Sequence, residues 1–171
     1  MENFSSVYGL TKEDIVLWNN VVGVGTKVFN FQIPNYYQIK GAIGQGSYGV
    51  VMSALDMRNN SRVAIKKIVN LFEQNEFFQK RILREVKIMK HYSLTNAPNL
   101  LPLLDLVLPQ SFDSFRDCYI VTPLMEFDLS RITNVSKPAT ERMAKYLIFQ
   151  ILEGLVSVDL FFLFFLLILF F

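Results

Sequence analysis

Three glycines and one lysine in the first half of the chain have types and spacing suited to chemistry with an anion. Gly44, Gly46 and Gly49 form a Gly-x-Gly-x-x-Gly run, and Lys66 ends the sequence Val-Ala-Ile-Lys. Glycine has no Cβ, so a turn built on it can bring its backbone close to a bound anion. The stretch from residue 43 to residue 66 therefore suggests a clamp for the phosphates of a nucleotide.

The residues around the glycines exclude two common phosphate-binding folds. A dinucleotide-binding fingerprint continues into a helix after its third glycine, but residues 50–55 are apolar and β-branched and lack a capping residue. The phosphate loop of nucleoside triphosphatases requires Lys and then Ser or Thr, where this chain has Val50 and Val51. A glycine hairpin between two strands remains, and the turn formers of residues 56–61 lead to a third strand that carries Lys66.

A helix should follow this third strand. Apolar residues recur at helical spacing in Phe78, Ile82, Val86 and Met89. Asn75 is a plausible cap, and the helix should end near His91 or Tyr92. Its outward face is basic, which indicates either a solvated surface or a site for acidic peptides or phosphate. The basic residues are Lys80, Arg81, Arg84, Lys87 and Lys90.

One carboxylate of this helix lies beside the apolar stripe. Glu85 turned toward the sheet would need a cationic partner, because burying an unpaired charge is costly. Lys66 is the obvious candidate. Strand alternation points the neighbouring Lys67 to the opposite face, and we assign Lys67 to solvent.

Further along the chain, residues 100–108 and 118–122 have the composition of strands, and Thr140 is a suitable cap for a helix over residues 141–155. The residues between the fifth strand and this helix begin with Pro-Leu-Met-Glu-Phe-Asp-Leu at 123–129.

These motifs, in this order, resemble the protein kinase family. The match is to its glycine-rich loop and to the lysine of Val-Ala-Ile-Lys. Residues 83–89, Leu-Arg-Glu-Val-Lys-Ile-Met, look like the corresponding segment of MAP kinases, and residues 123–129 resemble the hinge between the two kinase lobes. The resemblance covers roughly residues 31–155 and ends near Leu155.

The resemblance implies an α+β fold that consists of a kinase N-lobe and the start of a C-lobe. We expect a five-stranded antiparallel sheet with one regulatory helix at 36–122, a hinge at 123–129 and the beginning of the C-lobe at 130–155. Residues 1–35 would be an N-terminal extension and residues 156–171 an apolar tail outside the family. The kinase domain at 36–155 is therefore truncated.

The resemblance also implies a site for ATP in a serine/threonine kinase of the MAP kinase type. Lys66 and Glu85 would be the catalytic pair, with the Lys66 ammonium on the α- and β-phosphates. Thr122 would be the gatekeeper beside the adenine, Leu124 and Met125 would supply backbone groups to it, and Asp128 would face the ribose. The full set of nucleotide contacts is Ile43, Gly44, Gln45, Gly46, Ser47, Tyr48, Gly49, Val51, Ala64, Lys66, Thr122, Leu124, Met125 and Asp128.

The groups that complete phosphoryl transfer are not found in the chain. This family uses an aspartate and an asparagine of the catalytic loop and the aspartate of Asp-Phe-Gly, which holds magnesium. Magnesium is thus a family expectation whose ligands this chain lacks, and no metal site is predicted. Asp117 and Asp159 stand in tempting fragments at the wrong places. We expect the chain to bind ATP weakly and to transfer no phosphate, because binding the ground state alone does not accelerate chemistry.

Composition narrows the class further. The chain of 171 residues is 51% hydrophobic with a formal net charge of +2, too balanced for a dedicated nucleic-acid binder. One cysteine and one histidine leave no internal disulfide or zinc cluster and suggest a reducing compartment. Without a visible secretory signal we expect a cytoplasmic or nuclear protein. The family resemblance implies protein substrates and an upstream kinase as partners.

The two ends of the chain are less distinctive. Thr11 could cap a helix over residues 12–19, which would be a strap on the domain or a peptide for a partner. Residues 160–171 are only Leu, Phe and Ile, too short for a membrane span. They resemble translated thymine-rich non-coding DNA, and the alternative is a membrane-associating terminus.

Two further functions stay open. One is a non-catalytic N-lobe module that binds a nucleotide or a partner. The other is a membrane-tethered nucleotide sensor, although the short tail argues against a membrane.

Overall fold

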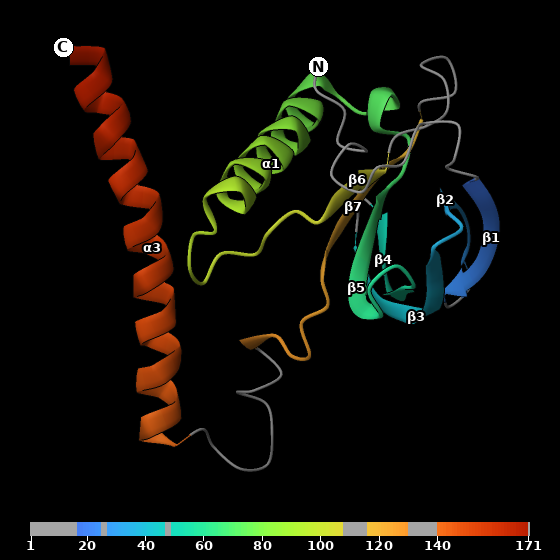
Figure 1. Cartoon of the computed structure of the whole chain (residues 1–171). Coiled ribbons are helices and arrows are strands. Elements are labelled where there is room, and N and C mark those ends of the chain that lie inside the picture. Colours follow the sequence, from blue (N-terminus) through green and yellow to red (C-terminus); the bar gives the residue numbers. More distant parts are fainter. Residues whose placement is uncertain (1–16, 25–26, 47–48, 108–115, 130–139, 171) are drawn as a thin grey trace. The chain divides into compact units, whose positions relative to one another are not determined.

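The computed structural model of the chain describes residues 17–24, 27–46, 49–107, 116–129 and 140–170 (Figure 1). The chain divides into two compact units. The first contains the residues up to Ile88 and Leu103–Leu124, and the second contains Met89–Pro102 and the residues from Met125 onward.

The first unit is built on a five-stranded sheet of order β3-β4-β5-β7-β6. All four pairings are antiparallel. The strands are β3 Tyr37–Gly46, β4 Gly49–Asp56, β5 Ser61–Ile68, β6 Asp105–Val107 and β7 Cys118–Pro123. The predicted α+β fold with its five-stranded antiparallel sheet is confirmed.

The predicted strand over 100–108 is much shorter in the structure, where only Asp105–Val107 form β6. Pro102 has no N–H to donate to a neighbouring strand. Pairing begins at Leu104, whose N–H donates to the carbonyl of Val121 at 2.9 Å.

A two-stranded hairpin precedes the sheet. Strands β1 Leu17–Val24 and β2 Lys27–Pro34 pair antiparallel, with Leu17 opposite Pro34. The predicted helix over 12–19 is wrong where it can be judged, because residues 17–19 belong to β1; residues 12–16 lie outside the described residues. Strand β2 alternates, with Phe31 and Ile33 fully buried and Gln32 exposed, and β1 takes its conformation by pairing with it.

The main core lies between this hairpin and one face of the sheet. Strand β4 buries every second residue, and β5 does so from Val63 to Lys67. The hairpin lies against the sheet (Figure 1) and contributes Phe31 and Ile33 to the same apolar cluster. The other buried members are Tyr37, Val50, Met52, Ala54, Val63, Ile65, Val107, Tyr119 and Val121.

Helix α1 spans Glu76–Thr95, and Phe78 and Ile82 of the predicted stripe are buried. The predicted cap is present, because Asn75 Oδ1 accepts a hydrogen bond from the Phe78 N–H at 2.9 Å. The helix ends later than the predicted His91 or Tyr92, just before Asn96, whose φ of 49° is left-handed as at many helix ends. The five basic residues of its outward face are all exposed.

The second unit contains α3, Glu141–Phe170, which begins at the predicted cap: Thr140 Oγ1 accepts from the Met143 N–H at 3.3 Å. The helix continues past the predicted end at Leu155, since no Gly or Pro follows to stop it. The loop at Asn99 packs on buried Gly154, where a Cβ would lie 3.2 Å from the Asn99 carbonyl oxygen. Within the described part of the chain, no helix has both the length and the apolar character that a membrane crossing needs.

Candidate nucleotide site

Strand pairing brings several of the predicted ATP contacts to one face of the sheet. Val51 of β4 lies opposite Lys66 of β5, and Ala64 of β5 lies opposite Thr122 of β7. Directly opposed residues of an antiparallel pair point to the same side. Val51, Ala64, Lys66 and Thr122 therefore share the face that is turned away from the hairpin core.

The predicted ion pair between strand and helix is present. Lys66 Nζ lies 2.6 Å from Glu85 Oε1 and donates a hydrogen bond to it. The side chains are 41% and 35% exposed, so solvent screens the pair and it adds at most about 1 kcal/mol to stability. Its main effect is geometric, because it holds a solvent-accessible ammonium at one place on the sheet face.

The glycine loop connects β3 to β4. Gly46 and Gly49 are opposed at its base, and Ser47 and Tyr48, two predicted nucleotide contacts, lie outside the described residues. An added Cβ at Gly44 or Gly46 would meet nothing within 4 Å. No neighbour in the described chain therefore demands glycine at these two positions, and the open space beside them suits the close approach of a ligand. Ile43 and Gln45 are exposed.

Gly49 differs from the other two glycines. A Cβ built on it would lie 1.8 Å from the carbonyl oxygen of Lys67, and its φ is +158°. This glycine is required by the fold itself, since β4 passes directly against the backbone of β5.

The predicted hinge residues are divided between the two units. The Leu124 N–H already donates to the Arg62 carbonyl at 3.2 Å, so only the carbonyl of Leu124 is left to contact a base. The expectation that Leu124 supplies a backbone group to the base stays a prediction, with the carbonyl as that group. Met125 and Asp128 belong to the second unit and are exposed. Their contacts with adenine and ribose stay predictions.

The assignment of Lys67 to solvent is wrong. The Lys67 side chain is 6% exposed, and its Nζ lies 2.7 Å from Asp117 Oδ2 and donates to the Asn30 carbonyl of β2. Alternation correctly places Lys67 on the face of β5 opposite to Lys66. That face packs against the β1–β2 hairpin and forms the core. Val63 and Ile65 lie on the same side as Lys67 and are both buried. Their apolar side chains are the sequence feature that indicates a buried face.

Asp117, which stands in a fragment at the wrong place for catalysis, has a structural role. One carboxylate oxygen faces Lys67, and the other accepts the Asn70 N–H at 2.9 Å. The backbone next to it is also tied, because the Leu71 N–H donates to the Arg116 carbonyl at 2.7 Å. The start of β7 is thus fixed to the segment that leaves β5 toward α1.

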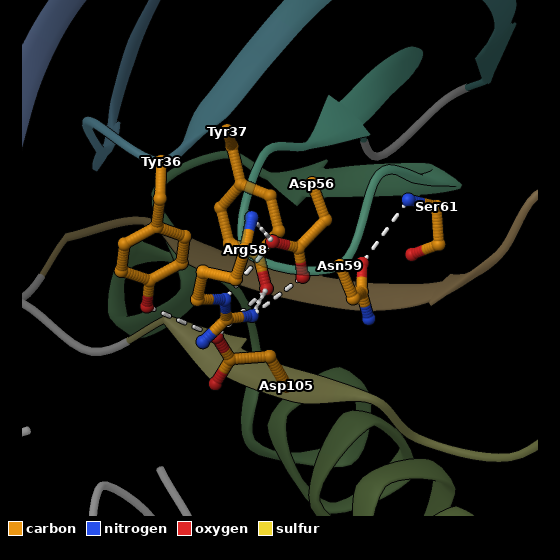
Figure 2. Close-up of polar contacts among 7 residues, drawn as sticks. All are labelled: Tyr36, Tyr37, Asp56, Arg58, Asn59, Ser61 and Asp105. Carbon is orange, nitrogen blue, oxygen red and sulfur yellow. Dashed lines mark hydrogen bonds and ion pairs between the residues drawn. The ribbon is translucent and has the colours of Figure 1, made fainter. Parts of the chain in front are cut away.

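A second polar cluster joins β3, β4 and β6 at the far end of the sheet, as Figure 2 shows. Arg58 donates two side-chain hydrogen bonds to the buried Asp56, from Nε to Oδ1 at 2.9 Å and from Nη2 to Oδ2 at 2.7 Å. Tyr37 accepts from Arg58 Nη2 at 3.0 Å and donates to Asp105 Oδ2 at 2.9 Å. The guanidinium also lies over the Tyr36 ring, 3.9 Å from its centroid.

This cluster shifts the titration of its phenols. Burial and the nearby Asp105 carboxylate raise the pKa of Tyr36 to about 12. The same two causes, burial first, raise the pKa of Tyr37 further. Both hydroxyls are therefore neutral donors at physiological pH, and the cluster is a structural brace rather than a source of protons.

Cys118 begins β7 close to the Lys66–Glu85 pair. Burial, and secondly the charge of Glu85, raise the pKa of its thiol to about 11. A buried thiol of high pKa is a poor nucleophile, which argues against Cys118 as a nucleophile.

The described residues contain no group of three or more His, Cys, Asp or Glu side chains that could hold a metal ion. ATP phosphates fit better, because the held ammonium of Lys66 and the open glycine positions belong to the same sheet.

Comparison with known proteins gives a consistent result. Residues 37–158 match the description "Protein kinase domain". The chain is 41% identical to "Mitogen-activated protein kinase 10" of Arabidopsis thaliana over 73% of this chain and 31% of that protein. It is 40% identical to "Mitogen-activated protein kinase 14" of the same plant, over 84% and 36% of the two chains.

A relative from a second organism gives a similar result. "Extracellular signal-regulated kinase 1" of Dictyostelium discoideum is 39% identical over 73% of this chain and 23% of that protein. The chain thus spans about a third of the length of the curated relatives that it matches, or less.

Proposed function

Because this chain belongs to the protein kinase family and is similar to MAP kinases, we propose that its first unit binds ATP through the phosphates. The observation that carries this proposal is the ion pair of Lys66 with Glu85 at 2.6 Å, on the sheet face beside the glycine hairpin. Lys66 and Glu85 would be the catalytic pair of an enzyme type that transfers the terminal phosphate of ATP to serine or threonine side chains of proteins.

Each part of the site has a separate task. The Lys66 ammonium, held by Glu85, donates to the α- and β-phosphates, and the backbone of Gly44 and Gly46 approaches the phosphate chain without side-chain hindrance. Val51 and Ala64 offer apolar contact to the base from the same face. Thr122, beside Ala64 in the strand register, bounds the adenine on that face.

This chain on its own is proposed to bind ATP without transferring its phosphate. The described residues offer no carboxylate set for magnesium, and the sequence shows neither the catalytic-loop aspartate nor its asparagine. Lys66 and the glycine loop alone stabilise the bound nucleotide and not specifically the transition state. For a longer kinase of this type, the proposed partners are protein substrates and an upstream kinase. The proposed location is the cytoplasm or the nucleus.

Titration of the chain with a fluorescent ATP analogue tests the proposal. Lys66→Met should weaken binding at least about tenfold, since a hydrogen bond to a charged group contributes about 1.5–3 kcal/mol. Lys80→Met is the matched control, because Lys80 pairs with Glu76 on the exposed side of α1 and its side chain is 66% exposed. That variant should bind like the wild type.

Two results would count against the proposal. Equal affinity of the Lys66→Met variant and the wild type for the ATP analogue would contradict phosphate binding by Lys66. Transfer of labelled phosphate to a generic protein substrate, lost in Lys66→Met, would instead show that the chain is catalytically competent.

A further inference from the structure

Lys67 is in contact with three separate parts of the first unit. Its carbonyl oxygen abuts Gly49, where the glycine hairpin ends. Its ammonium donates to the Asn30 carbonyl of the N-terminal hairpin and pairs with Asp117 at the start of β7. The preceding residue in β5 is Lys66, whose ammonium points to the opposite face.

The ammonium of Lys67 is enclosed by groups that suit a cation. The rings of Phe31 from the hairpin and Tyr119 from β7 have centroids 5.5 Å and 5.4 Å from Nζ. The hairpin is joined to the same place by a second bond, from the Gln32 N–H to the Tyr119 hydroxyl at 3.0 Å. A buried ammonium is tolerated only with such partners, so docking of the hairpin and burial of Lys67 require each other.

The effect extends toward the helix that carries Glu85. Asp117, the anionic partner of Lys67, also accepts the Asn70 N–H at 2.9 Å. Asn70 lies just after β5, and the chain continues from it through the short 3₁₀ turn η3, Leu71–Glu73, into α1. The Lys67–Asp117 pair therefore fixes both the end of β5 and the first residues of the connection to Glu85.

We propose that Lys67 is a positioning residue that couples docking of the N-terminal hairpin to the geometry of the Lys66–Glu85 pair. The hairpin, on the core side of the sheet, thereby sets the affinity of the opposite face for the nucleotide's phosphates. This last step rests on the proposed nucleotide site, whereas the coupling between hairpin and α1 does not.

The test compares the full chain with Lys67→Met, which keeps most of the stem and removes the ammonium. Hydrogen exchange is followed in two peptides, residues 17–24 of the hairpin and residues 82–88 of α1, and affinity for the fluorescent ATP analogue is measured in parallel. We expect faster exchange in both peptides and about tenfold weaker binding, equivalent to about 1.4 kcal/mol. Lys80→Met should change neither.

A double-mutant cycle separates positioning from a general loss of stability. Glu85→Gln also acts through the ammonium of Lys66, so adding Lys67→Met to it should weaken binding no further than Glu85→Gln alone. If the double variant instead shows the product of the two single losses of affinity, the two residues act independently and the proposal is overturned. So would faster exchange confined to the hairpin, with α1 and affinity unchanged.

The proposal can still be tested if the wild type binds no nucleotide or if Lys67→Met does not fold. If the wild type binds no nucleotide, the proposed function fails, and exchange in residues 82–88 alone decides on the coupling. If Lys67→Met does not fold, Asp117→Asn replaces it, because the amide keeps an acceptor for the Asn70 N–H and removes only the charge. Unchanged exchange in α1 of that variant contradicts the proposal.

Discussion

Two adjacent lysines of one strand have opposite roles because a strand turns successive side chains to opposite faces. Lys66 is about two-fifths exposed and held by Glu85, where it can still meet a ligand. Lys67 is buried between the hairpin and β7, where its partners are protein groups. The same ammonium group is thus accessible to solvent on one face and enclosed by protein groups on the other.

At the residue scale the three glycines of the hairpin should also differ. Gly49→Ala should lower the free energy of unfolding by about 1–3 kcal/mol or more, since the new methyl group would overlap the Lys67 carbonyl oxygen. Gly44→Ala is the matched control, with nothing within 4 Å of its Cβ. Urea denaturation measures both, and equal losses of stability in the two variants would contradict the structure.

A second residue-scale prediction concerns pH. Folding raises the pKa of Tyr36 from its ordinary value of 10.0 to about 12, mainly by burial. The neutral phenol therefore stabilises the folded state fully below pH 10, and this contribution is lost as the pH rises to about 12. Tyrosinate absorbance of the folded chain should include a group that titrates near the upper value and is missing in Tyr36→Phe. Identical high-pH titrations of the two proteins would refute this assignment.

At the scale of elements, α1 carries Glu85 to its partner, and its start is fixed by one side chain. Asn75→Ala removes the acceptor for the Phe78 N–H and should destabilise the first unit by about 1 kcal/mol. Asn75→Asp keeps an acceptor there and should retain most of the stability. Thermal unfolding monitored by circular dichroism compares them, and a loss as large in Asn75→Asp as in Asn75→Ala would exclude a capping role.

The β1–β2 hairpin is the other element that matters for the site. Without it, the core face of the sheet, with Val50, Met52 and Ile65, would lack the cover that Phe31 and Ile33 provide. The hairpin is also the source of the carbonyl that accepts from Lys67. Residues that look like an appendage in the sequence are therefore part of the core of the first unit.

At the scale of the whole molecule, the chain matches part of a protein kinase domain, over residues 37–158. It spans about a third of the length of the matched MAP kinases or less, and the described residues offer no metal cluster. The two units are each compact, and the predicted hinge at 123–129 includes the boundary between them. Binding without phosphate transfer is what this set of groups supports best.

Much of this architecture follows from local signals that the sequence contains. Apolar and β-branched runs separated by turn formers indicated the strands, the stripe of Phe78 and Ile82 indicated α1, and Asn75 and Thr140 marked the beginnings of two helices. The spacing of Glu85 beside that stripe predicted its pairing with Lys66. These features depend on neighbours within one or two turns or on one strand, so sequence patterns record them.

Only the tertiary structure decided which face of β5 is buried and which conformation residues 17–24 adopt. Lys67 is buried, and Asp117 acquires a role, because the hairpin of residues 17–34 covers that face of the sheet. Strand β1 replaces part of the predicted helix because β2 offers it a partner. Each of these results depends on contacts between residues far apart in the chain, and local periodicity holds no information about such contacts.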